Sequence, residues 1–76
     1  MITQLCCAKP GSVCQIINIK GVNRNRLAEL GFSSGTNVTV INHHNHGPID
    51  ILVRSYHIAL RQEEAENIIV KVLNKV

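Results

Sequence analysis

The stretch Arg26–Gly35, RLAELGFSSG, decides how the rest of the sequence is interpreted, because it contains a helix and the signal that ends it. Leu27 and Leu30 are three residues apart, so they face the same side of a helix. Gly31 follows directly, and glycine is the usual residue at the left-handed position that ends a helix. The pattern therefore predicts a helix over residues 23–30.

The start of this helix also has recognisable signals. Asn23 is a suitable N-cap, since its side-chain oxygen can accept from free amides of the first turn. Val22 precedes it at the spacing that forms a hydrophobic staple with Leu27. Two helical turns are too few to be stable alone in water, so we expect the helix to pack against a sheet.

Strand patterns surround the helix on both sides. Five segments alternate apolar and polar residues, and Val and Ile, which favour strands, are abundant in them. They cover residues 12–20, 36–43, 49–54, 56–61 and 68–73. The third and fourth meet around Ser55, which predicts a tight hairpin. Residues 62–67, QEEAEN, predict one helical turn, with Asn67 in a left-handed exit.

The alternation also predicts which side chains form the core. The predicted core consists of Val13, Ile17, Ile19, Leu27, Leu30, Phe32, Val38, Val40, Ile51, Val53, Ile58, Leu60, Ala65, Ile68 and Val70. In the first strand Cys14 and Ile16 fall on the opposite face, so a bulge or burial on both faces is left open. Four more apolar residues fit either a partner patch or additional core: Ile41, Leu52, Ile69 and Leu73.

These elements predict a mainly β protein with a single domain over residues 1–76. The expected architecture is a small, partly open antiparallel barrel of about five strands with one short helix and one helical turn. Side chains fill such a barrel and leave no catalytic cavity, so we expect no enzyme. Phe32 and Tyr56 are the only aromatic residues, too few for a Pro-rich peptide groove or a base-stacking platform.

The charge pattern gives little support to nucleic-acid binding. Eight Lys and Arg against five Asp and Glu give a net charge of +3. The basic residues are dispersed, and only Arg24 and Arg26 lie close together. Nucleic-acid binding usually requires a basic stripe. The longest apolar run, Leu5–Ala8, is far shorter than a membrane helix, and we expect no direct membrane insertion.

Histidines offer weak candidates for a metal site. His43, His44 and His46 lie within four residues in a polar loop, and imidazole is a common ligand of transition metals. A structural zinc site, however, normally has four ligands on rigid backbone. The sequence therefore predicts exposed loop histidines, with weak Fe or Zn binding as the alternative, and no resident cofactor.

The three cysteines do not form a recognisable metal motif. Cys6 and Cys7 are adjacent rather than spaced as C-x-x-C, and neighbouring thiols rarely bind one metal tetrahedrally. Cys14 lies on a predicted strand, where it is expected to pack as a small apolar residue. We expect free or buried thiols in a reducing compartment.

Two blocks of the sequence together resemble the FeoA family of bacterial ferrous iron transport. The first is R-L-x-E-L-G-F-x-x-G-T-x-V-x-V over residues 26–40, and the second is I-A-L-R-x-E-E-A over residues 58–65. The resemblance extends over about residues 5–73. It implies a stand-alone SH3-like domain, which also resembles the C-terminal domain of iron-dependent repressors.

The resemblance implies a cytoplasmic accessory protein that binds the cytosolic part of an FeoB-like ferrous iron permease and modulates its GTP-dependent transport. It would lie at the inner membrane through this partner. A stand-alone metal-sensing or regulatory module is the alternative, and association with further copies of the chain is left open. The candidate partner-binding residues surround the helix and its exit: Arg24, Arg26, Leu27, Leu30, Gly31, Phe32 and Gly35.

Overall fold

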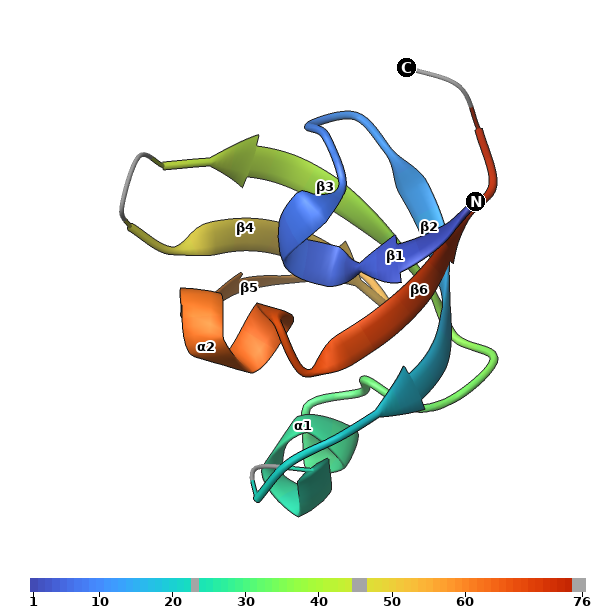
Figure 1. The fold of residues 1–76 in the computed structure, drawn as a ribbon. Coiled ribbons are helices and arrows are strands. Elements are labelled where there is room, and N and C mark those ends of the chain that lie inside the picture. The colour runs from blue at the N-terminus through green and yellow to red at the C-terminus, as the bar shows by residue number, and fades with distance from the viewer. Residues whose placement is uncertain (23, 45–46, 75–76) are drawn as a thin grey trace.

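The computed structural model describes residues 1–22, 24–44 and 47–74. Six antiparallel strands form one curved sheet, with short helices at its ends and over its open side (Figure 1). The strands are β1 (Ile2–Gln4), β2 (Val13–Ile19), β3 (Asn37–His43), β4 (Ile49–Val53), β5 (Tyr56–Leu60) and β6 (Ile68–Val72). The helices are the 3₁₀-helix η1 (Leu5–Cys7), α1 (Arg24–Glu29) and α2 (Gln62–Ala65). The mainly β prediction is confirmed.

The sheet order is β1-β6-β2-β3-β4-β5, so the N-terminal strand and β5 form the two edges. β1 and η1 are absent from the predicted elements. A strand of three residues is too short to show an alternating pattern. β1 is a strand because it pairs with β6, with Ile2 opposite Lys71. Leu5 in η1 and Ala8 after it are buried in the core, which the sequence analysis also missed.

Strand β2 corrects part of the predicted core. Its buried residues are Cys14, Ile16 and Ile19, whereas Ile17 is 41% exposed and was wrongly assigned to the core. The register with β6 shifts between Ile16 and Asn18. One extra residue at such a bulge reverses the alternation, so the face that begins with Cys14 continues at Ile19. The bulge that the pattern left open is therefore present.

Most of the remaining core prediction is confirmed. Ten predicted residues are buried: Leu27, Phe32, Val38, Val40, Ile51, Val53, Leu60, Ala65, Ile68 and Val70. Val13, Leu30 and Ile58 are half-buried. Of the four apolar residues left open, Ile41, Leu52 and Leu73 are exposed and Ile69 is half-buried.

Helix α1 ends as its sequence predicts. Gly31 has a φ of +105°. The N–H of Phe32 donates to the carbonyl of Leu27 at 2.9 Å, and the N–H of Gly31 donates to the carbonyl of Ala28 at 3.0 Å. These two bonds form a Schellman motif, which satisfies carbonyls that the end of the helix leaves free. The motif turns the chain so that Phe32 enters the core beside Leu27.

The predicted start of α1 has a different outcome. Val22 is 99% exposed, so the staple with Leu27 is wrong. The Asn23 N-cap lies outside the described residues. A staple needs an apolar contact across the first turn, and here the side chain of Val22 points into solvent.

The two predicted turns near β5 and α2 also differ in outcome. The predicted tight hairpin around Ser55 is present, and it has a two-residue turn in which Arg54 and Ser55 have φ values of 50° and 72°. Asn67 does not adopt the predicted left-handed exit. Its side-chain amide instead donates to the carbonyl of Glu63 at 3.1 Å and ends α2 in that way. Within the described part of the chain, no helix is long and apolar enough to cross a membrane.

Replacing Gly31 by valine should destabilise the domain by about 1–3 kcal/mol, because a β-branched residue is strained at this φ. Denaturant unfolding measures the loss. Ala28→Val is a matched control, since it adds the same side chain at an exposed position of α1 and should cost about 0.6 kcal/mol. Equal losses in the two variants would contradict this role of Gly31.

The N-terminal segment should contribute to stability through Leu5, which is fully buried. Leu5→Ala should lower the free energy of unfolding by about 2–5 kcal/mol, as for other truncated core residues. Leu73→Ala, at a position 48% exposed, should change it by less than about 0.5 kcal/mol. If both variants unfold at the same denaturant concentration, β1 and η1 are not part of the cooperative core.

Candidate functional site

Helix α1 and the loop after it carry all seven candidate partner-binding residues, at one end of the barrel (Figure 1). Leu27 and Phe32 are fully buried in the core, so they anchor the helix to the barrel. Arg24 and Arg26 are exposed on the helix itself. The structure thus divides the predicted set into a buried anchor and an exposed surface.

The exit of the helix contributes the rest of this surface. Leu30 and Gly31 are half-buried, and Gly35 is exposed with a φ of +89°. A Cβ atom at Gly31 would lie 3.5 Å from Cδ of Arg54, so the β4–β5 turn reaches the end of α1. The Arg54 side chain therefore adjoins the exposed part of the predicted set, Arg24, Arg26, Leu30, Gly31 and Gly35, which is the candidate docking face and is called the docking face below.

The loop that follows α1 is held against β2 by hydrogen bonds. The N–H of Gly35 donates to the carbonyl of Ile16 at 2.7 Å, and the Ser34 hydroxyl donates to the carbonyl of Ile17 at 3.0 Å. These bonds give partners to backbone groups of both segments and hold the loop to β2. The exit of α1 is thereby joined to the sheet.

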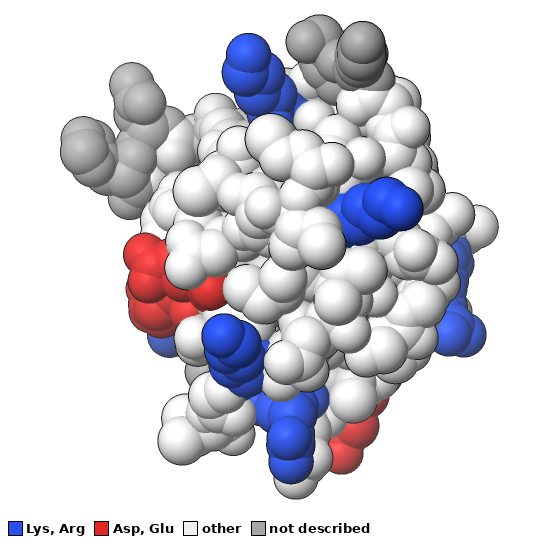
Figure 2. Space-filling model, turned by 45° about the vertical axis from the view of Figure 1, so that its right-hand side comes forward, with Lys and Arg blue, Asp and Glu red and all other residues white. Residues whose placement is uncertain are grey.

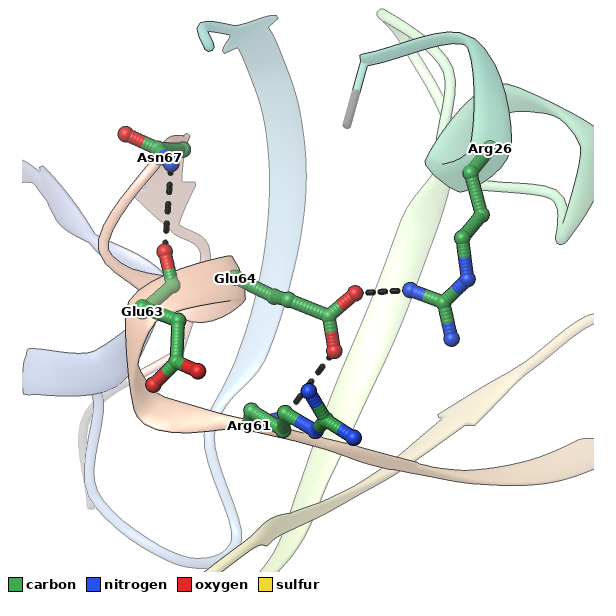
Figure 3. Close-up of polar contacts among 5 residues, drawn as sticks. All are labelled: Arg26, Arg61, Glu63, Glu64 and Asn67. Atoms are coloured by element: carbon green, nitrogen blue, oxygen red, sulfur yellow. Dashed lines mark hydrogen bonds and ion pairs between the residues drawn. The ribbon is translucent and has the colours of Figure 1, made fainter. Parts of the chain in front are cut away.

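An ion pair ties α1 to α2 beneath the docking face. Glu64 in α2 is only 4% exposed, and its Oε2 accepts from Nη1 of Arg26 (Figure 3). Its Oε1 accepts from the backbone N–H of Arg61 at 3.2 Å, at the start of α2. One carboxylate thus caps α2 and holds Arg26. A carboxylate buried to this extent must be paired, and here both of its oxygens are.

The hollows around this surface are shallow. One of about 270 Å³ lies between α1 and β2, and another of about 180 Å³ lies beside the ion pair. The larger is lined by Asn18, Ile19, Arg24, Asn25, Ala28, Phe32, Ser33 and Ser34, and the smaller by Arg26, Arg61, Glu63 and Glu64. Both hollows are open to solvent.

Figure 2 shows basic side chains mostly standing apart around a largely uncharged face. This distribution agrees with the dispersed charge of the sequence and differs from the continuous basic stripe of nucleic-acid-binding proteins. Within the face that the figure presents, electrostatic attraction would thus act through individual side chains.

Two of the three predicted histidines, His43 and His44, lie within the described residues and do not come together there as a metal centre. Nε2 of His44 lies 3.0 Å from Oδ2 of Asp50, and Nε2 of His57 lies 3.8 Å from Oδ1 of the same carboxylate. His43 is half-buried, and its Nε2 has no hydrogen-bond partner among the described residues. His46 lies outside the described residues. Across residues 1–22, 24–44 and 47–74, no three His, Cys, Asp or Glu side chains are grouped to hold a metal ion.

The cysteines have three different environments. Cys14 is buried, Cys6 is half-buried and Cys7 is exposed, and all three are free thiols. Burial raises the pKa of Cys14. It is also the main reason why the pKa of Cys6 rises to about 11, together with the neighbouring Cys7 and Glu66. Free thiols were the expected state.

The sequence analysis missed Glu64, Arg61 and Arg54 as supports of the docking face. For Glu64 a signal existed, because a Glu at the third position of a helix commonly reaches back to the N–H of the cap residue. Its partner Arg26 is 38 residues away in the chain, and no local pattern predicts that contact.

Removing the arginine of the ion pair should destabilise the domain. Arg26→Ala leaves the buried Glu64 carboxylate with one partner fewer, and we expect a loss of about 1–3 kcal/mol in the free energy of unfolding. Arg24→Ala, in the same helix but exposed, should change it by less than about 0.5 kcal/mol. A double-mutant cycle with Glu64→Gln should show losses that do not add. Additive losses would contradict a direct pair.

Comparison with known proteins agrees with this fold. The chain aligns with a crystal structure of an iron uptake regulatory protein, FeoA, at 29% identity and a TM-score of 0.89, covering 96% of this chain and 99% of that one. It aligns with the Stenotrophomonas maltophilia FeoA complexed with zinc, a procaryotic SH3 domain protein, at 23% identity and a TM-score of 0.80, covering 93% and 89%. The SH3-like architecture is thereby confirmed.

The fold also occurs inside a longer protein. The chain aligns with T. acidophilum IdeR at 20% identity and a TM-score of 0.84, covering 93% of this chain but 34% of that one. No curated protein sequence matches the chain. The model of the FeoA domain matches residues 3–72, nearly the whole sequence. The chain therefore belongs to the FeoA-domain family of small proteins related to ferrous iron transport.

Proposed function

We propose that the protein is a non-catalytic accessory factor that binds the cytosolic part of an FeoB-type ferrous iron permease through the docking face. Family membership supports a role in ferrous iron transport, since the FeoA-domain match extends over residues 3–72. The choice of surface is supported by one observation: Leu27 and Phe32 anchor α1 and its exit in the core, whereas Arg24 and Arg26 of the same helix are exposed. The protein would act in the cytoplasm and reach the inner membrane through its partner.

The chemistry of the docking face favours a folded protein surface as the partner. Arg24 is exposed, and Arg26 keeps a side chain that is 59% exposed although it contacts Glu64. Arginines of this kind are enriched in protein interfaces and pair well with carboxylates. Leu30 adds apolar area at their side. A pre-ordered helix loses little conformational freedom on binding, which favours affinity.

Binding alone would be enough to modulate transport. A partner that prefers one state of the permease's GTP-binding domain shifts the population of that state by its difference in affinity. No catalytic group on this chain is required for such an effect. The proposal thus assigns the GTP-dependent chemistry to the permease and a regulatory contact to this chain.

The direct test is binding to purified cytosolic domains of the permease, with and without guanine nucleotide. We expect a dissociation constant on the order of tens of micromolar or tighter. Arg24→Glu should weaken binding at least about tenfold, because reversing a charge in a contact adds repulsion. Lys71→Glu makes the same change at an exposed position of β6, away from α1, and should bind as the unmodified protein does. Equal weakening by both variants would exclude the docking face, and absence of binding both with and without guanine nucleotide would reject the partner.

A further inference from the structure

The adjacent thiols of Cys6 and Cys7 are arranged differently from what their spacing suggests. They lie on η1, where successive side chains point about 120° apart. Their sulfur atoms are nevertheless only 3.9 Å apart, because both turn toward the side chain of Gln4. Oε1 of Gln4 lies 3.5 Å from Sγ of Cys6 and 4.0 Å from Sγ of Cys7. Three donor atoms from three residues thus form a compact triangle.

The size of this triangle matches one face of a tetrahedral metal site. With zinc–sulfur bonds of about 2.3 Å, two thiolates on one ion lie about 3.8 Å apart. With a zinc–oxygen bond of about 2.1 Å, each sulfur lies about 3.6 Å from the oxygen. The observed 3.9, 3.5 and 4.0 Å differ from these values by at most about 0.4 Å. Small side-chain rotations would therefore bring all three atoms onto a single ion.

The backbone beneath the thiols is held in place on both sides. Leu5 before them and Ala8 after them are buried in the core, and the N–H of Ala8 donates to the carbonyl of Leu5 at 3.1 Å. Gln4 is the last residue of β1 and pairs with Ile69 of β6. The backbone positions from which the three donors project are therefore held by the fold, and only their side-chain torsions need to adjust to a metal.

From this geometry we propose that Cys6, Cys7 and Gln4 form a binding site for a thiophilic divalent cation such as Zn(II). The two thiolates would supply the strong bonds and the amide oxygen a weaker third one. The fourth position would face solvent, because Cys7 is exposed. No redox change is involved: two S–H bonds break, two metal–sulfur bonds form, and two protons pass to water.

The electrostatic surroundings determine how binding should depend on pH. Cys6 is affected by Cys7 in its own turn and by Glu66 at the end of α2. Burial and these groups raise the pKa of Cys6 to about 11, so without metal the thiol is protonated at neutral pH. A cation must displace that proton, and the negative charge of Glu66, which opposes the thiolate, favours the cation. Affinity should therefore fall steeply as the pH is lowered, up to about 100-fold per pH unit when two protons are displaced.

The test is titration of the reduced protein with Cd(II), followed through the ultraviolet charge-transfer band of thiolate-bound cadmium, with Zn(II) as the competitor. We expect one ion per chain and release of about two protons. Cys7→Ser, an exposed and structurally mild change, should weaken binding at least about tenfold, and Cys6→Ser should do the same. Circular dichroism checks that each variant is folded.

Two controls distinguish this site from other thiols and from the histidines. Cys14→Ala removes the buried thiol of β2, and His44→Ala removes the imidazole on Asp50, and both variants should keep the band and the affinity. The site is rejected if the cadmium band is absent, if Cys7→Ser binds as tightly as the unmodified protein, or if His44→Ala abolishes binding. The proposed function does not depend on this site, so failure of one leaves the other intact.

Discussion

The buried carboxylate of Glu64 is the polar contact on which the arrangement of the helices depends. It satisfies the N–H of Arg61, where β5 passes into α2, and it holds Arg26 of α1. The sheet alone would fix the strands, but neither helix is longer than six residues, and helices of that length have little stability of their own. Their positions depend on the apolar anchors beneath them and on this one shared charge. The pair is buried on the Glu64 side only, since the Arg26 side chain is 59% exposed.

The position of the docking face likewise depends on contacts between parts of the chain that are far apart in the sequence. Gly31 ends the helix at the point where Arg54 of the β4–β5 turn adjoins it, and hydrogen bonds to β2 hold the following loop. Three separate parts of the chain thereby determine where two exposed arginines lie. A surface that is already ordered by such contacts loses less conformational freedom when a partner binds.

The sequence predicts the parts of this structure that arise from local patterns. The alternation of apolar residues identified five of the strands, and the Leu27–Leu30 spacing with Gly31 identified α1 and its end. It could not predict β1, whose pairing with β6 joins residues near opposite ends of the chain, nor the burial of Ile16 in place of Ile17. The adjacent Ile16 and Ile17 are compatible with a bulge, but the sequence does not say which of the two it buries. The Arg26–Glu64 contact is equally non-local.

The same distinction holds for the thiols. Spacing argues against the Cys6–Cys7 pair as a metal site, because the usual motifs are defined by the backbone separation of their ligands. The distance between the sulfur atoms is set instead by side-chain torsions, and Gln4 supplies the polar group toward which both turn. Helix α2 adjoins both this pair, through Glu66, and the docking face, through Glu64. Proximity to one helix is not coupling, however, since coupling requires an element with two arrangements that each site biases. The cation site and the docking face are therefore separate proposals, each with its own test.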